Sequence, residues 1–267
     1  MSIRTTKYKV PNLLKQIQAF EELIQKETGK DLDHYMGVQF HYDKAQEECD
    51  FAYHCDPIDG IEMASTGFDG IHFSFLTDHG AAKDLDHAAI VLVDPSWHEY
   101  HVSLVASNLK DFLRLFITTK NVFSLQPEDD SYKNGEINED TDYIYRRLLE
   151  YFELTPFEDP VAYRNEMIDA RSRSVMLPTR NGLGVVQVSS DQHHASFDVD
   201  EDGDIDLSEL QTFFAKASVE SKLASIRDLQ EATVLTDDEL TDFPVEDLQN
   251  AGFIEEAKML KVIATDY

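Results

Sequence analysis

The sequence predicts an α+β fold, with a mixed or antiparallel sheet, flanking helices and a helical C-terminal tail. Three observations support this prediction. Short apolar or alternating runs, separated by Asp-Gly and Asp-Pro turns, fill residues 36–106 and are typical of strands. Apolar residues with helical spacing occur before and after that region. Beyond residue 190 the chain becomes far more acidic, so we expect an α+β domain over 1–190 and a tail over 191–267.

The elements of the first domain follow from these patterns. Pro11 opens an amphipathic helix. Four runs then predict strands: GVQFHY, GIHFSFL, AIVLVD and YHVSLVA. Helical spacing returns over 108–118, where Ser107 is the expected N-cap, and again over 143–154 and 160–171. Asn181 and Gly182 predict the tight turn of a hairpin over 174–188.

The tail combines helical spacing with strong negative charge. Residues 191–267 hold 20 acidic and 5 basic side chains, about half of the net charge of the whole chain. Leu210, Phe213 and Phe214 begin one expected helix, Thr236 with Glu239 forms a capping-box pattern, and residues 253–263 suit a last helix.

Charge and composition narrow the classes of function. A net charge of -29 opposes binding to phosphate backbones, so DNA and RNA are excluded as expected partners. The charge suits attraction of a basic protein, binding of divalent cations, or solubility alone. No apolar run approaches the roughly 20 residues that cross a bilayer, and no export signal is visible, so we expect a cytoplasmic protein without a membrane span.

A metal-binding pattern lies at the start of the tail. In DVDEDGDIDLSE, oxygen-bearing side chains alternate at Asp198, Asp200, Asp202 and Asp206, and Glu209 ends the loop. Asp204 stands where a backbone carbonyl would bind the ion. Gly203 occupies the position of a sharp turn, and Ile205 is the apolar residue that packs away from the ion.

This pattern resembles the EF-hand family over some 17 residues, since Phe197 before the loop and Leu210 after it supply the flanking apolar positions. The resemblance implies one bound Ca²⁺ with Asp198, Asp200, Asp202, Asp204, Asp206 and Glu209 as ligands. The alternative is an acidic, solvated loop before a helix. Two features depart from the family. There is room for only a short entering helix, and the loop looks solitary.

Other candidate sites are weaker. The segment 130–141 resembles a degenerate loop, but Tyr132 and Thr141 stand where ligands are needed, so we expect a surface turn. Cys49, His54 and Cys55, with His41 nearby, do not have the spacing of a common zinc site.

Three histidines also merit comment. We expect His193 and His194 to be surface histidines and His72 to be a hydrogen-bonded strand residue. No nucleophile or phosphate-binding motif accompanies them, so no catalytic or cofactor-binding residue is assigned.

The larger domain loosely resembles the SUKH superfamily of toxin-immunity proteins and cell-wall-synthesis regulators. The resemblance covers residues 10–120 and consists of the turn at Gly67, Asp69 and Gly70, a strand pair, and the helix that begins over Asn108 to Phe112. It implies a non-catalytic α+β module that binds another protein, and the acidic charge would suit a basic one.

We therefore expect a calcium-binding, non-catalytic protein-interaction module. The first rival is a calcium-responsive sensor whose tail exposes an apolar face to a target. The second is a hydrolase whose dispersed site the sequence does not reveal, and a deep pocket with convergent polar groups would favour it.

Overall fold

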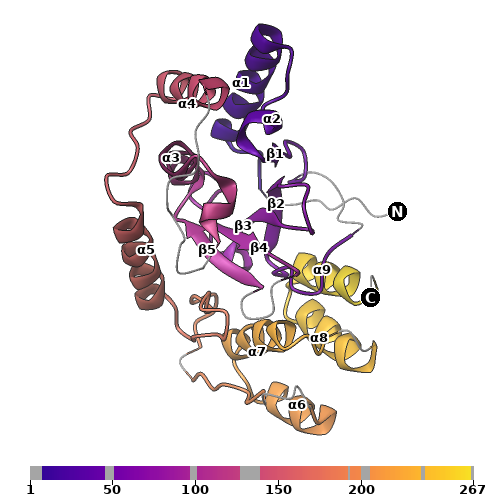
Figure 1. The fold of residues 1–267 in the computed structure, drawn as a ribbon. Helices are drawn as coiled ribbons and strands as arrows, with labels where there is room; N and C mark the ends of the chain where they lie inside the picture. The colour runs from indigo at the N-terminus through magenta and orange to yellow at the C-terminus, as the bar shows by residue number, and fades with distance from the viewer. Residues whose placement is uncertain are drawn as a thin grey trace.

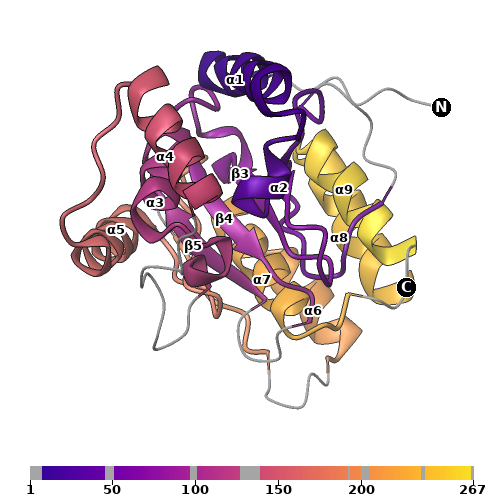
Figure 2. The ribbon, with the colours of Figure 1, turned by 45° about the horizontal axis from the view of Figure 1, so that its top comes forward.

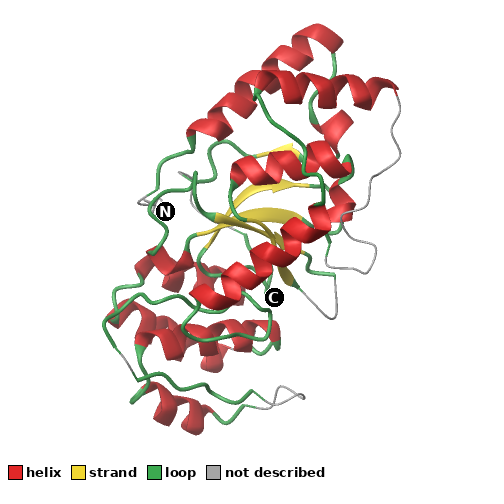
Figure 3. Ribbon diagram, turned by 90° about the vertical axis from the view of Figure 1, so that its left-hand side faces the viewer, coloured by secondary structure: helices red, strands yellow, loops and turns green. Residues whose placement is uncertain are grey.

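A computed structural model of the chain describes residues 8–45, 51–96, 101–126, 139–191, 193–199, 205–235 and 238–265. In this part of the chain, helices surround an antiparallel sheet, as the α+β prediction requires. The sheet lies between α1 to α4 at one end of the molecule and α6 to α9 at the other (Figures 1 and 3).

The sheet is a meander in the order β1-β2-β3-β4-β5. The strands are β1 (Gln39–Phe40), β2 (Gly60–Ser65), β3 (His72–Leu76), β4 (Ala89–Val93) and β5 (Val102–Ala106), and every neighbouring pair is antiparallel. All five residues of β3 are buried, because both faces of the sheet are covered. The sequence patterns did not identify β2, since GIEMAS contains few β-branched or aromatic side chains.

The first group of helices packs on one face of the sheet. It comprises α1 (Asn12–Thr28), the short α2 (Asp33–Met36), α3 (Leu109–Thr119) and α4 (Glu139–Tyr151). Phe20 and Phe112 are fully buried in this core, where the Phe112 ring lies 4.8 Å from that of Phe73 in β3. Helix α5 (Pro160–Ser174) lies beside α3 at the outside of the molecule (Figure 2).

Two local predictions need correction. The N-cap of α3 is Asn108 rather than Ser107: the Asn108 side chain accepts a hydrogen bond of 2.9 Å from the Asp111 amide, whereas the Ser107 amide donates to the Tyr163 hydroxyl. The expected hairpin over 174–188 contains a turn at Gly182, with φ of 74°, but only an isolated bridge between Leu177 and Val185. Tyr132 and the rest of the degenerate loop up to residue 138 lie outside the described residues.

In the described part of the tail, the helices are α6 (Leu207–Phe214), α7 (Val219–Glu231), α8 (Asp238–Asn250) and α9 (Ile254–Thr265). Thr236, the first residue of the capping-box pattern, falls outside the described residues. The tail helices share a hydrophobic core with residues from much earlier in the chain. Ala52 and Ile58 precede β2, and Leu177 and Val185 follow α5.

A buried ion pair also links the tail to an earlier part of the chain. Arg227 of α7 donates to the Asp59 carboxylate at 2.7 Å, and their side chains are 2% and 0% exposed. Burial by itself would raise the pKa of Asp59, but the Arg227 guanidinium and His79 hold that pKa below its ordinary value. Arg227 also donates to the Gly184 carbonyl oxygen, so one side chain joins α7 to two distant segments.

None of the helices in the described ranges has the length and apolar character that crossing a bilayer requires.

Candidate functional site

The acidic loop lies between an extended segment and α6. The segment over 193–199 contains no helix, so the expected short entering helix is absent there. Hydrogen bonds to side chains of α7 hold the chain before and within this segment. The Val188 and Ser189 amides donate to the Glu220 carboxylate at 2.9 and 2.6 Å, and the Ala195 amide donates to the Ser221 hydroxyl at 2.8 Å. These bonds hold the chain before the loop against α7.

Three of the six expected calcium ligands are described. Asp198 and Glu209 are exposed, and Glu209 stands in the first turn of α6. Asp206 is the N-cap of α6, because one carboxylate oxygen accepts from the Ser208 amide at 2.8 Å and from the Glu209 amide at 3.3 Å. The Ser208 hydroxyl donates to the same oxygen at 2.7 Å, and this bond together with the two amide bonds lowers the pKa of Asp206, so it is ionised at neutral pH. Asp200, Asp202 and Asp204, like Gly203, lie outside the described residues.

Apolar side chains anchor both ends of the loop. Val199, just inside the start of the loop, is 3% exposed, and Leu210 after its end is fully buried in the core shared with α7. Ile205 packs against the same core, as predicted for the residue that points away from the ion. The rings of Phe197 and Phe213 lie 5.4 Å apart, so aromatic residues from before and after the loop meet.

A shallow hollow of about 450 Å³ adjoins the loop. Its lining includes Phe197, Thr212, Phe213 and Lys216, together with Glu209, the residue expected to close the calcium shell. A movement of Glu209 on binding an ion would therefore change the wall of this hollow.

The two histidines before the loop lie in different environments. His193 is exposed, as expected for a surface histidine. His194 is half-buried instead, and its Nδ1 lies 3.0 Å from the Ser218 hydroxyl oxygen.

His72 of β3 is hydrogen-bonded, as predicted. Its Nδ1 lies 2.8 Å from the Gly70 carbonyl oxygen and its Nε2 lies 3.1 Å from the Asp56 carboxylate. Burial alone would lower the pKa of His72, but Asp56 and Gly70 raise it above the ordinary value. Both ring nitrogens of His72 are therefore engaged by other groups of the protein.

A second hollow, of about 340 Å³, lies over the turn between β2 and β3. Asp56, Glu62 and His72 form its polar lining. Three phenylalanines near it are exposed to solvent: Phe51 by 55%, Phe68 by 61% and Phe123 by 43%. The Phe68 and Phe123 rings lie 6.0 Å apart, so residues from distant parts of the chain form one aromatic patch.

The histidines considered for zinc are separated. His41 follows β1 and lies 3.1 Å from the Glu62 carboxylate and 3.0 Å from the Ser65 hydroxyl oxygen, so it contacts side chains of β2 and is not in the cluster with Cys55. Cys49 lies outside the described residues. His101 lies next to His54 and Cys55, and the sequence patterns did not predict this. Its place at the start of the predicted strand YHVSLVA was the only available signal.

The chain matches no protein-family model, and a search of curated proteins finds no similar sequence.

Proposed function

We propose that this protein binds one calcium ion in the loop from Asp198 to Glu209. One observation carries the proposal: the alternating carboxylates of DVDEDGDIDLSE lead directly into α6, with Glu209 in its first turn. Ca²⁺ takes six to eight oxygen ligands at about 2.3 to 2.6 Å, which alternate side chains of such a loop supply.

The described ends of the loop support this chemistry. Asp206 caps α6 with one carboxylate oxygen, which leaves the other able to reach the ion directly or through a water molecule. Glu209 is exposed and would supply two oxygens. Seven acidic residues lie between Asp198 and Glu209, so their mutual repulsion opposes a compact loop until a cation binds.

The anchored ends favour a structural role for the ion. Val199 and Leu210 are buried in the tail core, and a bound ion would fix the ten residues between them. Binding to the folded state alone stabilises that state by mass action, so calcium should raise the thermal stability of the tail.

Calorimetric titration of the metal-stripped protein with calcium and then with magnesium tests the proposal. We expect one calcium site, with weaker or absent binding of magnesium, which requires a smaller and more regular shell. Glu209→Gln should abolish or strongly weaken the calcium signal, because it replaces one of two carboxylate oxygens by a hydrogen-bond donor. The matched control is Glu246→Gln, which changes an exposed glutamate of α8. Equal calcium binding by both variants would refute the assignment.

A calcium-responsive sensor is the second candidate, favoured by the hollow of about 450 Å³ beside Glu209. If calcium moves α6, the exposure of Phe197 and Phe213 should change, and the fluorescence of a hydrophobic dye should rise when calcium is added. A structural ion predicts unchanged dye fluorescence together with a higher unfolding temperature.

We further propose that the α+β part binds another protein, through the patch of Phe51, Phe68 and Phe123. Exposed aromatic residues are enriched at interfaces, and the acidic charge would steer a basic partner towards them. The resemblance to the SUKH superfamily, drawn from the sequence, agrees with this role.

A peptide of alternating arginine and leucine provides a probe for this surface. Phe68→Ser should weaken its binding at least fivefold in fluorescence anisotropy, because an aromatic anchor is lost. Tyr151→Ser, at an exposed tyrosine of α4, is the control. Equal weakening in both variants, or none in either, would contradict a specific surface.

A further inference from the structure

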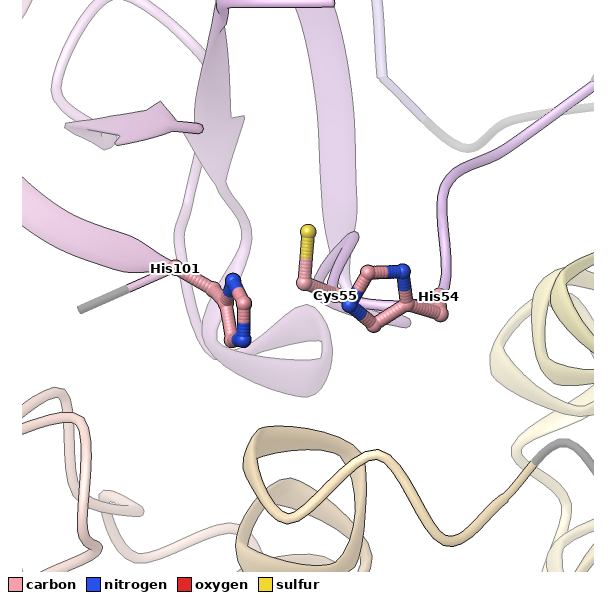
Figure 4. A group of neighbouring side chains, drawn as sticks. All are labelled: His54, Cys55 and His101. Atoms are coloured by element: carbon pink, nitrogen blue, oxygen red, sulfur yellow. The ribbon is translucent and has the colours of Figure 1, made fainter. Parts of the chain in front are cut away.

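Three side chains that commonly bind transition metals meet beside the sheet. His54 and Cys55 belong to the segment before β2, and His101 immediately precedes β5. One donor atom from each lies within 4.8 Å of the others, and Figure 4 shows the two imidazole rings on either side of Cys55. The two rings are 5.1 Å apart and nearly perpendicular.

The backbone fixes this arrangement. The Asp94 amide donates to the His101 carbonyl oxygen at 2.8 Å, which extends the pairing of β4 and β5 to His101. On the other side, the Asp56 amide donates to the Tyr53 carbonyl oxygen at 3.0 Å and closes a turn around His54 and Cys55. Gln230 of α7 donates to the Asp56 carbonyl oxygen at 2.8 Å, so the turn is also held against the tail.

The chemistry and burial of these donor atoms favour metal binding. Cys55 is 3% exposed, and Nδ1 of His101 is buried without a hydrogen-bond partner. A buried imidazole nitrogen normally has a hydrogen-bond partner or binds a metal. A neutral imidazole and a thiolate are ligands that Zn²⁺ prefers.

The surrounding charges favour a divalent cation. The carboxylates of Asp56, Glu231 and Asp94 lie near enough to Cys55 to act on its thiol electrostatically. Burial is the largest effect and raises the pKa of Cys55, and these negative charges raise it further. A bound dication would instead lower the pKa of the Cys55 thiol, because its charge compensates those of the thiolate and the nearby carboxylates. The Glu231 carboxylate also accepts a hydrogen bond from the His101 amide, which holds it beside the cluster.

We propose that His54, Cys55 and His101 bind one Zn²⁺ ion, with a water molecule in the fourth position. Zinc–nitrogen bonds of about 2.0 Å and zinc–sulfur bonds of about 2.3 Å place neighbouring tetrahedral ligands about 3.5 Å apart, so side-chain movements on the order of 1 Å would close the site. The bound ion joins the segment before β2 to the start of β5. The site is independent of the calcium loop, whose all-oxygen ligands suit a harder ion.

Cobalt substitution tests the site. The full chain would carry Cys49→Ser, so that Cys55 is the remaining thiol, and would be stripped of metal and saturated with calcium before titration with Co²⁺. We expect near-ultraviolet charge-transfer absorption from a cobalt–thiolate bond that saturates at one equivalent and is abolished by zinc. Adding Cys55→Ser or His101→Gln should remove this absorption or weaken the binding at least tenfold.

Two controls make the result decisive. His87→Gln changes a histidine whose side chain is 81% exposed, and it should leave the cobalt titration unchanged. Glu209→Gln should also leave it unchanged, which separates this site from the calcium loop. His101 is only half-buried, so its variant should keep the far-ultraviolet circular dichroism of the parent chain. Absence of the charge-transfer absorption at one equivalent of cobalt, or its persistence in a folded His101→Gln variant, would overturn the proposal.

Discussion

Replacing Arg227 by methionine should destabilise the protein strongly, because it leaves the Asp59 carboxylate buried without its cation. The two side chains are 2% and 0% exposed and are joined by a hydrogen bond of 2.7 Å. Removing one partner of a buried ion pair costs about 3 to 5 kcal/mol, whereas an exposed pair contributes on the order of 1 kcal/mol or less. We therefore expect the free energy of unfolding to fall by about 4 kcal/mol at pH 7.

Urea denaturation followed by circular dichroism measures this loss. With a denaturant dependence of about 2.5 kcal/mol per molar urea, the midpoint should fall by about 1.5 M. The matched control is Arg146→Met, which breaks an exposed ion pair with Asp142 and should change the midpoint by less than about 0.3 M. Adding Asp59→Asn to Arg227→Met should restore part of the loss, because it removes the uncompensated charge.

The stability lost in the single variant Arg227→Met should also depend on pH. Without Arg227, the folded state takes up a proton on Asp59 or on His79, whose Nε2 lies 3.8 Å from that carboxylate. A folded state that binds more protons than the unfolded state gains stability as the pH falls. The deficit of the variant should therefore shrink from pH 7 to pH 5. A loss below about 1 kcal/mol at pH 7, or a deficit that grows on acidification, would refute the reasoning.

Three further predictions concern groups outside the proposed metal sites. Burial lowers the pKa of His79 to about 4. As the pH falls below 6.5, the unfolded chain therefore binds a proton on this histidine that the folded chain does not bind. The free energy of unfolding should drop by about 1.4 kcal/mol per pH unit down to about pH 4. Denaturation curves should show a flatter pH profile for His79→Gln, and equal slopes would contradict the prediction. Gly70→Ala places a Cβ 2.5 Å from the Tyr53 ring, whereas a Cβ at Gly67 meets no atom within 4 Å and has a similar positive φ. Gly70→Ala should therefore lower the unfolding temperature more than Gly67→Ala, and equal shifts would exclude the steric explanation. Glu220→Gln replaces the charged acceptor of the Val188 and Ser189 amides, which precede the acidic loop, by a neutral and weaker one. Hydrogen exchange at residues 188 and 189 should therefore accelerate, and unchanged protection of these amides would contradict the prediction.

Local patterns predicted much of the fold. Helix α1 follows from apolar residues at helical spacing, and β3 and β4 follow from short apolar runs between turns. Local hydrogen bonding also determines that Asn108 and not Ser107 is the N-cap of α3, because the cap is the side chain that reaches the amide three residues ahead. The strand β2 was missed because its residues have weak strand preferences.

Long-range contacts could not be predicted in this way. Asp59 and Arg227 are 168 residues apart, and nothing near either residue identifies its partner. His101 reaches His54 and Cys55 only because the pairing of β4 with β5 extends to Asp94 and His101. The acidic loop differs from these cases, since its candidate ligands lie within 12 consecutive residues and their spacing is itself the signal.

A crystal structure of the protein grown with ample calcium tests the central claim most directly. The account predicts one ion in the loop, at about 2.3 to 2.6 Å from oxygens of Asp198, Asp200, Asp202 and Glu209 and from the carbonyl oxygen of Asp204, with Asp206 bound directly or through water. A well-ordered loop with no ion, and with the Glu209 carboxylate turned into solvent, would contradict it.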